Sequence, residues 1–290
     1  HEGDECYWTR PIPSERRGGW RDFWLAADMP EYTSNSMAGW LFDGDGNKVA
    51  FHDRYRADAY TDFALDYLRG RNDQDRPLLM MLSLVEPHAQ PYHKLYQGPP
   101  PAARTRHEYR EITYEGPDDL VAAFADAPLP PDLEELPGKA REFWPDYLAA
   151  CQRVDWNVGR VLEKFEELDM ADNTLVLFAS DHGCHFFSHL PNVAKCTAHE
   201  SSIHIPMLAL GPGFRGGRAV TEPVSLIDLA PTVLRVASRN LPAEMRGLAL
   251  QDVVAGKTAR PGVRVELPGP DGGAFECRAD RDQDRRSRHR

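Results

Sequence analysis

The side chains best suited to chemistry are gathered between residues 177 and 206, in the stretch LFASDHGCHFFSHLPNVAKCTAHESSIHIP. This stretch follows an apolar run and contains five histidines, two cysteines, one aspartate and one lysine. An aspartate and an imidazole can both bind a divalent cation, and an ammonium group can neutralise an anion. Asp181 and His182 are therefore candidate metal ligands, and Lys195 is a candidate anion-binding residue.

Two apolar runs would position these side chains. Asp181 and His182 come directly after TLVLFAS, residues 174–180, and His88 comes shortly after PLLMMLSLV, residues 77–85. Both runs are too short for amphipathic helices, and they are typical of strands buried on both faces. In open parallel sheets, ligands bind at the carboxyl ends of the strands. A cleft with His88 on one strand end and Asp181 on another is therefore predicted.

Helical periodicity and turn signals indicate the elements around these runs. Apolar residues at helical spacing predict helices over 56–71, 147–168 and 225–237, and IPMLALGPG at 205–213 predicts a third strand. Strands that alternate with helices favour βαβ units, so we expect an α/β fold with a mostly parallel sheet.

The segment FDGDGNKVAF, residues 42–51, predicts a hairpin around Asp45-Gly46. It superficially resembles a calcium-binding loop. An EF-hand requires glycine at its sixth position and glutamate at its twelfth, where this chain has Lys48 and Arg54. The hairpin is therefore the favoured interpretation.

Two other interpretations of the histidine-rich stretch remain open. A structural zinc site could draw on six residues, which are His182, Cys184, His185, His189, Cys196 and His199. The two cysteines are too far apart for the usual paired spacing. Alternatively, four histidines are exposed side chains of a polar loop, which are His185, His189, His199 and His204. Only Asp181 and His182, which the buried strand holds, would then be functional.

Composition excludes some classes of protein. The net charge of −11 disfavours nucleic-acid binding, and 41% hydrophobic residues are enough for a sizeable core. No apolar run approaches the roughly 18 residues that a membrane span requires. Five cysteines, an odd and small number, argue against a disulfide framework.

Taken in order along the chain, these motifs resemble the sulfatase family of the alkaline phosphatase superfamily. Sulfatases carry a strand, then S-D-[HN]-G, then K-x4-E-[GS]-S-x-R-[VI]-P, and this chain has SDHG at 180–183 and KCTAHESSIHIP at 195–206. The segments PLLMMLSLVEPH, GPGF, VSLIDLAPTVL and RGLAL are similar to family segments in the expected order. The resemblance implies an alkaline-phosphatase-like α/β/α sandwich.

The resemblance also implies roles for single residues. Asp181 and His182 would bind one divalent cation, with Ca²⁺ expected and Mn²⁺, Mg²⁺ or Zn²⁺ as alternatives. His88 and Lys195 would be catalytic, and His199 would contact the substrate, a small-molecule or saccharide sulfate ester. Metal-assisted sulfate ester hydrolysis is the leading hypothesis. A phosphodiester or phosphonate monoester hydrolase of the same superfamily, a non-catalytic remnant of the fold, and a zinc-binding interaction module are the alternatives.

The chain departs from the family pattern at its beginning and its end. The nucleophile of sulfatases is a formylglycine made from the first residue of C/S-x-P-x-R, and this motif is absent. Cys6 and Arg10 have the right spacing, but Trp8 replaces the proline, so Cys6 is predicted not to be the nucleophile. We therefore expect an N-terminally truncated and inactive piece. Residues 1–256 would form a partial domain and 257–290 a charged, disordered tail.

Overall fold

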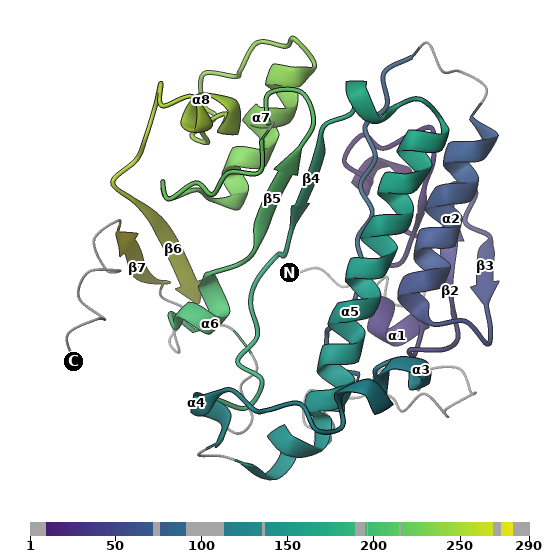
Figure 1. The fold of residues 1–290 in the computed structure, drawn as a ribbon. Helices are drawn as coiled ribbons and strands as arrows, with labels where there is room; N and C mark the ends of the chain where they lie inside the picture. The colour runs from purple at the N-terminus through teal and green to yellow at the C-terminus, as the bar shows by residue number, and fades with distance from the viewer. Residues whose placement is uncertain are drawn as a thin grey trace. The chain divides into compact units, whose positions relative to one another are not determined.

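The computed structural model describes residues 10–71, 76–90, 113–134, 137–188, 195, 197–214, 216–268 and 274–280. The chain divides into two compact units, His1–Leu168 and Asp169–Arg290. In Figure 1 the first unit runs from purple to teal and the second from green to yellow. Cys6, His189 and Cys196, which the sequence analysis considered, lie outside the described residues.

The first unit contains a small antiparallel sheet in the order β1-β2-β3, formed by Leu25–Ala26, Gly39–Asp43 and Lys48–Phe51. The predicted hairpin between β2 and β3 is confirmed. The carboxylate of Asp43 accepts the backbone N–H groups of Asp45 and Asn47 at 2.9 and 2.8 Å. Hydrogen bonds from Asn47 lower the pKa of Asp43. The Asp43 carboxylate therefore caps its own turn.

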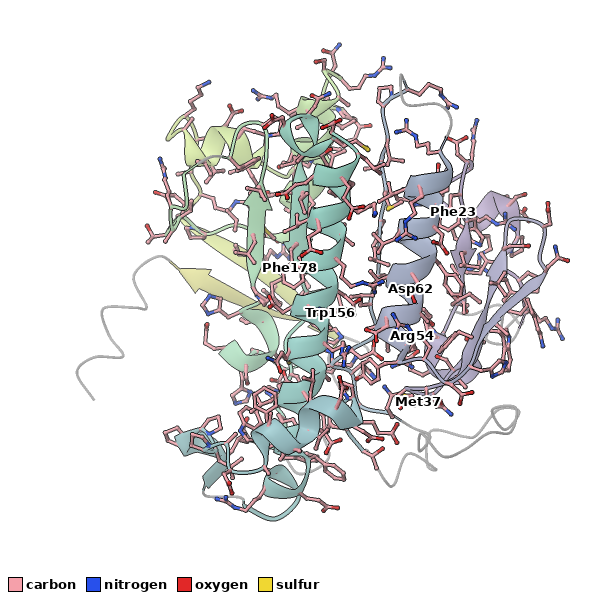
Figure 2. All side chains as sticks on the ribbon, turned by 45° about the vertical axis from the view of Figure 1, so that its right-hand side comes forward. Phe23, Met37, Arg54, Asp62, Trp156 and Phe178 are labelled. Carbon is pink, nitrogen blue, oxygen red and sulfur yellow. The ribbon has the colours of Figure 1, made fainter. Side chains whose placement is uncertain are left out.

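The predicted helix at 56–71 is confirmed as α2, Arg56–Gly70. Ala59 and Tyr60 of α2 pack against Leu41 and Phe51 of the sheet. The long helix α5, Pro137–Glu167, lies along α2 on the side away from the sheet (Figure 1). Polar contacts tie the helices together, because Asn157 donates to Asp58 at 2.9 Å. At the start of α2, Arg54 pairs with Asp62 at 2.9 Å (Figure 2).

The prediction of a strand buried on both faces at 77–85 is wrong for the described structure. The segment is extended, but it forms no ladder with any described residue. Leu82 and Leu84 pack against the core formed by the sheet and α2, while Leu79 and Met81 are 60% and 73% exposed. Because alternate residues of an extended chain point to opposite faces, a single packing layer covers only every second side chain.

The second unit contains β4, Val176–Ala179, and β5, Met207–Leu210. The α/β class is confirmed, but β4 and β5 pair in the antiparallel direction. Every ladder among the described residues is antiparallel, so the predicted parallel pairing is not found there. The chain between β4 and β5 contains one short described helix, α6, Glu200–Ile203, and it turns back rather than crossing over.

The rest of the second unit is organised around Asp228. This buried carboxylate accepts the backbone N–H groups of Ser225 and Leu248 at 2.8 and 2.7 Å, and it pairs with Arg260 at 2.5 Å. It thereby joins the start of α7, Leu229–Val236, to the chain before α8, Leu250–Val254. The helix predicted at 225–237 is confirmed as η5, Leu226–Asp228, followed by α7.

The segment expected to be a disordered tail contains an antiparallel hairpin, β6 Gly262–Pro268 and β7 Ala274–Asp280. Half-buried Val263 and Val265 alternate with exposed Arg264 and Glu266, which is the period of a strand. Residues 281–290 lie outside the described residues, and a domain boundary at 256 stays a prediction. The remaining short helices are η1 Ser14–Arg16, α1 Pro30–Thr33, α3 Asp118–Val121, η3 Ala122–Phe124, α4 Pro131–Glu134 and η4 Ala171–Asn173.

Among the described helices, none combines the length and the apolar character needed to cross a membrane.

Candidate functional site

The loop after β4 is held by close backbone contact with α6. The backbone N–H of Gly183 donates to the carbonyl oxygen of Ser202 at 2.8 Å. A Cβ atom at position 183 would lie 2.1 Å from the carbonyl oxygen of Ser201, so only glycine fits. Ser180 donates to the carbonyl oxygen of His182 at 2.6 Å and closes the turn. The SDHG motif therefore presents Asp181 and His182 on a constrained loop.

Three of the predicted site residues meet at the end of β4. Nζ of Lys195 lies 2.9 Å from Nε2 of His182, and Oδ2 of Asp181 lies 3.3 Å from the same nitrogen. The side chain of Asp181 is 82% exposed and that of His182 is 38% exposed. Lys195, 14 residues after Asp181, thus contacts the imidazole of His182.

The contacts of His182 define the position of its ring proton. A lysine ammonium group only donates, so Lys195 donates to the Nε2 lone pair of His182. The proton of the neutral ring is then on Nδ1, which donates to the carbonyl oxygen of Gly183 at 2.9 Å. Histidines that bind metals are usually oriented in this way by a backbone carbonyl. The Nε2 lone pair and the Asp181 carboxylate thus face the same small space.

This pair fits a divalent cation only in part. One imidazole nitrogen and one carboxylate are suitable ligands. The described residues contain no group of three or more His, Cys, Asp or Glu that could hold a metal ion. Asp181 and His182 could supply two ligands at most, and Lys195 donates to the lone pair that a cation would take.

His185 corrects one of the sequence predictions. It was expected to be an exposed histidine, but it is only 2% exposed. Its Nδ1 lies 2.7 Å from Oγ of Ser201, and its Nε2 lies 2.8 Å from Oγ1 of Thr197. Both ring nitrogens are thus engaged by hydroxyl groups, which disfavours His185 as a zinc ligand. The available sequence signal was the adjacent Phe186-Phe187 pair, since apolar residues in a polar loop indicate that the loop folds inward.

His199 and His204, the other described histidines of the stretch, are exposed. Nδ1 of His199 lies 2.9 Å from Oγ1 of Thr197, and its ring meets that of His185 edge to face at 5.5 Å. His204 is 79% exposed and pairs with Glu200 at 3.1 Å, in line with a surface role. His199 is therefore linked to the buried histidine through Thr197, while His204 is not part of this arrangement.

His88 lies in the first unit, whereas Asp181, His182 and Lys195 lie in the second. Its Nδ1 is 2.7 Å from the carbonyl oxygen of Ala89, and its Nε2 is 3.9 Å from the carboxylate of Glu31. The ring of His88 is half-buried. Two residues earlier in the chain, Glu86 pairs with Arg56 at 3.0 Å, and both of these side chains are buried.

The sequence analysis did not identify Arg56 as a functional residue, because it is simply the first residue of a predicted helix. Besides Glu86, it donates to Oγ of Ser34 at 3.1 Å. Burial alone would lower the pKa of Arg56, but the charge of Glu86 acts together with Tyr60, Tyr55 and Glu31 and raises the pKa. The guanidinium therefore stays protonated and ties α2 to the segment that carries His88. No sequence signal marks this pair.

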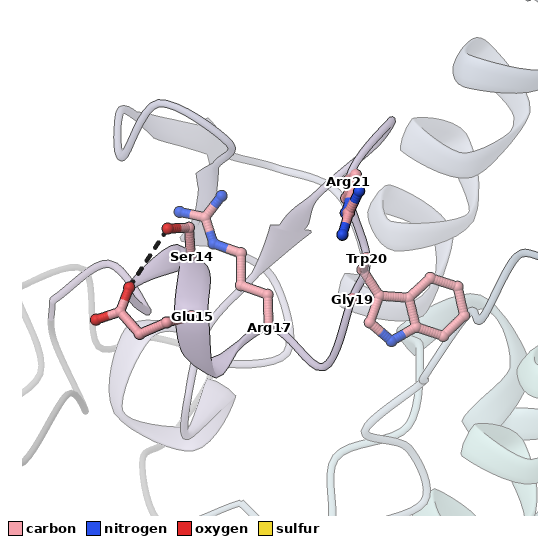
Figure 3. A pocket seen from close by; sticks show the side chains of 6 residues that line it. All are labelled: Ser14, Glu15, Arg17, Gly19, Trp20 and Arg21. Atoms are coloured by element: carbon pink, nitrogen blue, oxygen red, sulfur yellow. Dashed lines mark hydrogen bonds between the residues drawn. The ribbon is translucent and has the colours of Figure 1, made fainter.

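A separate hollow of about 430 Å³ lies near the beginning of the described chain (Figure 3). Arg17 and Arg21 line it with Ser14, Glu15, Gly19 and Trp20. Arg17 already donates to the carbonyl oxygens of Ile12 and Gly44, at 3.0 and 2.9 Å. None of the residues predicted to be functional lines this hollow.

Comparison with known proteins identifies similar chains. The family model described as Sulfatase matches residues 16–238. Arylsulfatase K of Mus musculus is 27% identical over 216 residues, which are 69% of this chain and 38% of the relative. The ulvan-active sulfatase of Formosa agariphila is 26% identical over 246 residues, which are 83% of this chain and 43% of the relative. The chain thus spans less than half the length of these relatives.

Solved structures show the same fold. The yidJ protein of Bacteroides fragilis, assigned to the sulfatases, matches with a TM-score of 0.72 and 22% identity over 94% of this chain and 57% of that chain. A phosphonate monoester hydrolase of Silicibacter pomeroyi matches with a TM-score of 0.54 and 21% identity over 92% and 57%.

Proposed function

Because the chain belongs to the sulfatase family, we propose that the site at the end of β4 serves the hydrolysis of sulfate esters. The observation that supports this most is the meeting of Asp181, His182 and Lys195 within 3.3 Å. A sulfate ester is an anion whose oxygens gain charge as the ester bond breaks. A lysine beside a metal-binding pair is a suitable arrangement for such a substrate.

Lys195 has the clearest role in this proposal. Its ammonium group would bind a sulfate oxygen and stabilise charge on the leaving oxygen. Because it donates to Nε2 of His182 in the structure, binding of substrate and cation would move it from the imidazole to the anion. Lys195 would then exchange the His182 imidazole for a sulfate oxygen as its hydrogen-bond partner.

Asp181 and His182 would hold one divalent cation, which supplies positive charge to the transferring sulfuryl group when bound. Gly183 fixes the His182 ring through the Nδ1 contact at 2.9 Å, so Nε2 is the ligand atom. Calcium is the proposed ion because sulfatases commonly hold it and because carboxylates suit it. The imidazole equally suits Mn²⁺ or Zn²⁺, and Mg²⁺ is a further alternative.

His88 would act as a general acid or contact the sulfate. Its Nδ1 faces the Ala89 carbonyl oxygen at 2.7 Å, so proton exchange would occur at Nε2. His199 would contact the substrate. The substrate would be a small-molecule or saccharide sulfate ester, and the name of the ulvan-active relative supports the saccharide class. Formylglycine would be the nucleophile of the whole protein.

The first test is to sequence the locus upstream of the codon for His1. An in-frame C/S-x-P-x-R motif would support the proposal, and a reading frame without it would contradict catalysis. The encoded protein should then turn over 4-nitrophenyl sulfate, and Lys195→Ala should lower this turnover by orders of magnitude. Lys257→Ala, an exposed lysine in the same unit, is the matched control.

The 290-residue chain has no C/S-x-P-x-R motif, so we expect it to hydrolyse no sulfate ester by itself. Turnover by this chain that disappears in Lys195→Ala would contradict this expectation and make Cys6 a candidate nucleophile again.

A phosphodiester or phosphonate monoester hydrolase is the second candidate, supported by the Silicibacter pomeroyi fold match. The ratio of turnover with 4-nitrophenyl sulfate to turnover with bis(4-nitrophenyl) phosphate separates the two activities. A remnant without catalysis would turn over neither compound. A zinc-binding module would bind zinc stoichiometrically even after Asp181→Ala.

A further inference from the structure

A continuous chain of hydrogen bonds joins Ser201, His185, Thr197 and His199. The distances along it are 2.7 Å from Ser201 Oγ to His185 Nδ1, 2.8 Å from His185 Nε2 to Thr197 Oγ1, and 2.9 Å from Thr197 Oγ1 to His199 Nδ1. His185 is buried and His199 is exposed. The chain thus runs from the interior of the loop to its surface.

Thr197 couples the two rings because its hydroxyl has a single proton. The Thr197 oxygen also accepts the backbone N–H of His199 at 3.3 Å. Its one proton can be donated to His185 Nε2 or to His199 Nδ1, but not to both. Whichever nitrogen does not receive this proton must itself donate to the oxygen. In the neutral state, the tautomer of His185 therefore dictates the tautomer of His199.

Ser201 favours one of the two possible directions. When Ser201 donates to His185 Nδ1, the ring proton of His185 lies on Nε2 and is donated to Thr197. Thr197 then donates to His199 Nδ1, and every hydroxyl proton of the chain is used. In the reverse direction, Ser201 accepts from His185 and its own proton has no place in the chain of hydrogen bonds. The first direction is preferred because it keeps every hydroxyl proton in an internal hydrogen bond.

We propose that His185, acting through Thr197, is a positioning residue that holds His199 in the tautomer with its proton on Nε2. His199 then presents an N–H donor rather than a lone pair, as a sulfate oxygen requires. The purpose assigned to this donor rests on the proposed function. The tautomer itself is a property of the loop and can be measured without substrate. Burial of His185 shields its ring nitrogens from competing water, whereas the bond between Thr197 and His199 is exposed.

Nitrogen-15 NMR of labelled histidine tests the proposal on the 290-residue chain, since the two neutral tautomers differ in their ring-nitrogen shifts. Spectra are recorded near pH 8, well above the ordinary histidine pKa of about 6.5. His199→Gln and His185→Gln assign the two rings. Thr197→Val removes the hydroxyl with little change in shape, Thr197→Ser restores it, and His204→Gln controls for a distant exposed ring.

In the wild-type chain and in Thr197→Ser, we expect His185 and His199 to be in the Nε2–H form. In Thr197→Val, the share of His199 in the Nδ1–H form should rise. An Nδ1–H form of His199 in the wild-type chain would overturn the proposal, as would a His199 spectrum unchanged by Thr197→Val.

Titration with sodium sulfate separates this proposal from the proposed function. Sulfate should shift the His199 Nε2 signal in the wild-type chain and less in Thr197→Val. If the tautomer behaves as expected but sulfate shifts nothing, the positioning by His185 is supported and the substrate contact by His199 is contradicted.

Discussion

Nζ of Lys195 lies 2.9 Å from Nε2 of His182, the atom that a cation bound with Asp181 would also need. The lysine is therefore both a neighbour and a competitor of the proposed cation. Replacing it with an uncharged side chain would free the imidazole lone pair and remove a positive charge from the site.

Lys195→Met should tighten the binding of Ca²⁺ or Mn²⁺ to this chain. A unit charge at roughly 4 Å from a divalent cation changes the binding free energy by about 2 kcal/mol in water, which is about thirtyfold in affinity. Isothermal titration calorimetry measures this change, and Asp181→Asn should abolish the binding. Lys257→Met is the control and should change nothing. Weaker cation binding in Lys195→Met would show that Asp181 and His182 do not form the cation site.

His185→Ala should loosen the loop after β4, because Ser201 and Thr197 lose a shared buried partner. Leaving such groups unsatisfied costs about 1–3 kcal/mol. Amide hydrogen exchange should speed up roughly tenfold in peptides that cover 180–188 and 197–204. His204→Ala, at an exposed position, is the control. Unchanged exchange in His185→Ala would mean that the buried histidine does not hold the loop.

The buried pair Arg56–Glu86 should stabilise the first unit only when both charges are present. Arg56→Met alone leaves an unpaired buried carboxylate and should cost about 3–5 kcal/mol, while Arg56→Met with Glu86→Leu should be much milder. All six tryptophans lie before residue 157, so tryptophan fluorescence in urea reports this unit. Equal losses in the single and double variants would contradict the importance of pairing.

Alkaline pH should destabilise the first unit through Tyr60. Burial raises the pKa of Tyr60 to about 12, above its ordinary value of about 10. The folded unit therefore keeps a proton that the unfolded chain loses, and stability falls as pH rises from about 10 to about 12. The fall should approach 2–3 kcal/mol, and Tyr60→Phe should remove most of it while leaving stability at pH 7 nearly unchanged. Tyr55, whose pKa burial also raises, adds to the remaining fall. An identical fall in Tyr60→Phe would assign the effect to other groups.

The sequence by itself determined the local elements and the residues at the end of β4. Helix α2 and the hairpin at Asp45-Gly46 follow from periodicity and turn chemistry, which depend on neighbours in the chain. Asp181 and His182 could be named because they directly follow a short apolar run, and Lys195 because a lysine 14 residues later can bind an anion. These signals lie in residue types and short spacings along the chain.

Only the tertiary structure decided which side chains are covered and which strands pair. Burial of His185, the Arg56–Glu86 pair, the exposed Leu79 and Met81, and the antiparallel β4–β5 ladder all depend on segments that are distant in sequence. Periodicity reports that a face is apolar, but it does not report which segment covers that face or in which direction a neighbouring strand runs. A buried histidine and an exposed one therefore have the same appearance in a sequence, and the contacts that distinguish them form only on folding.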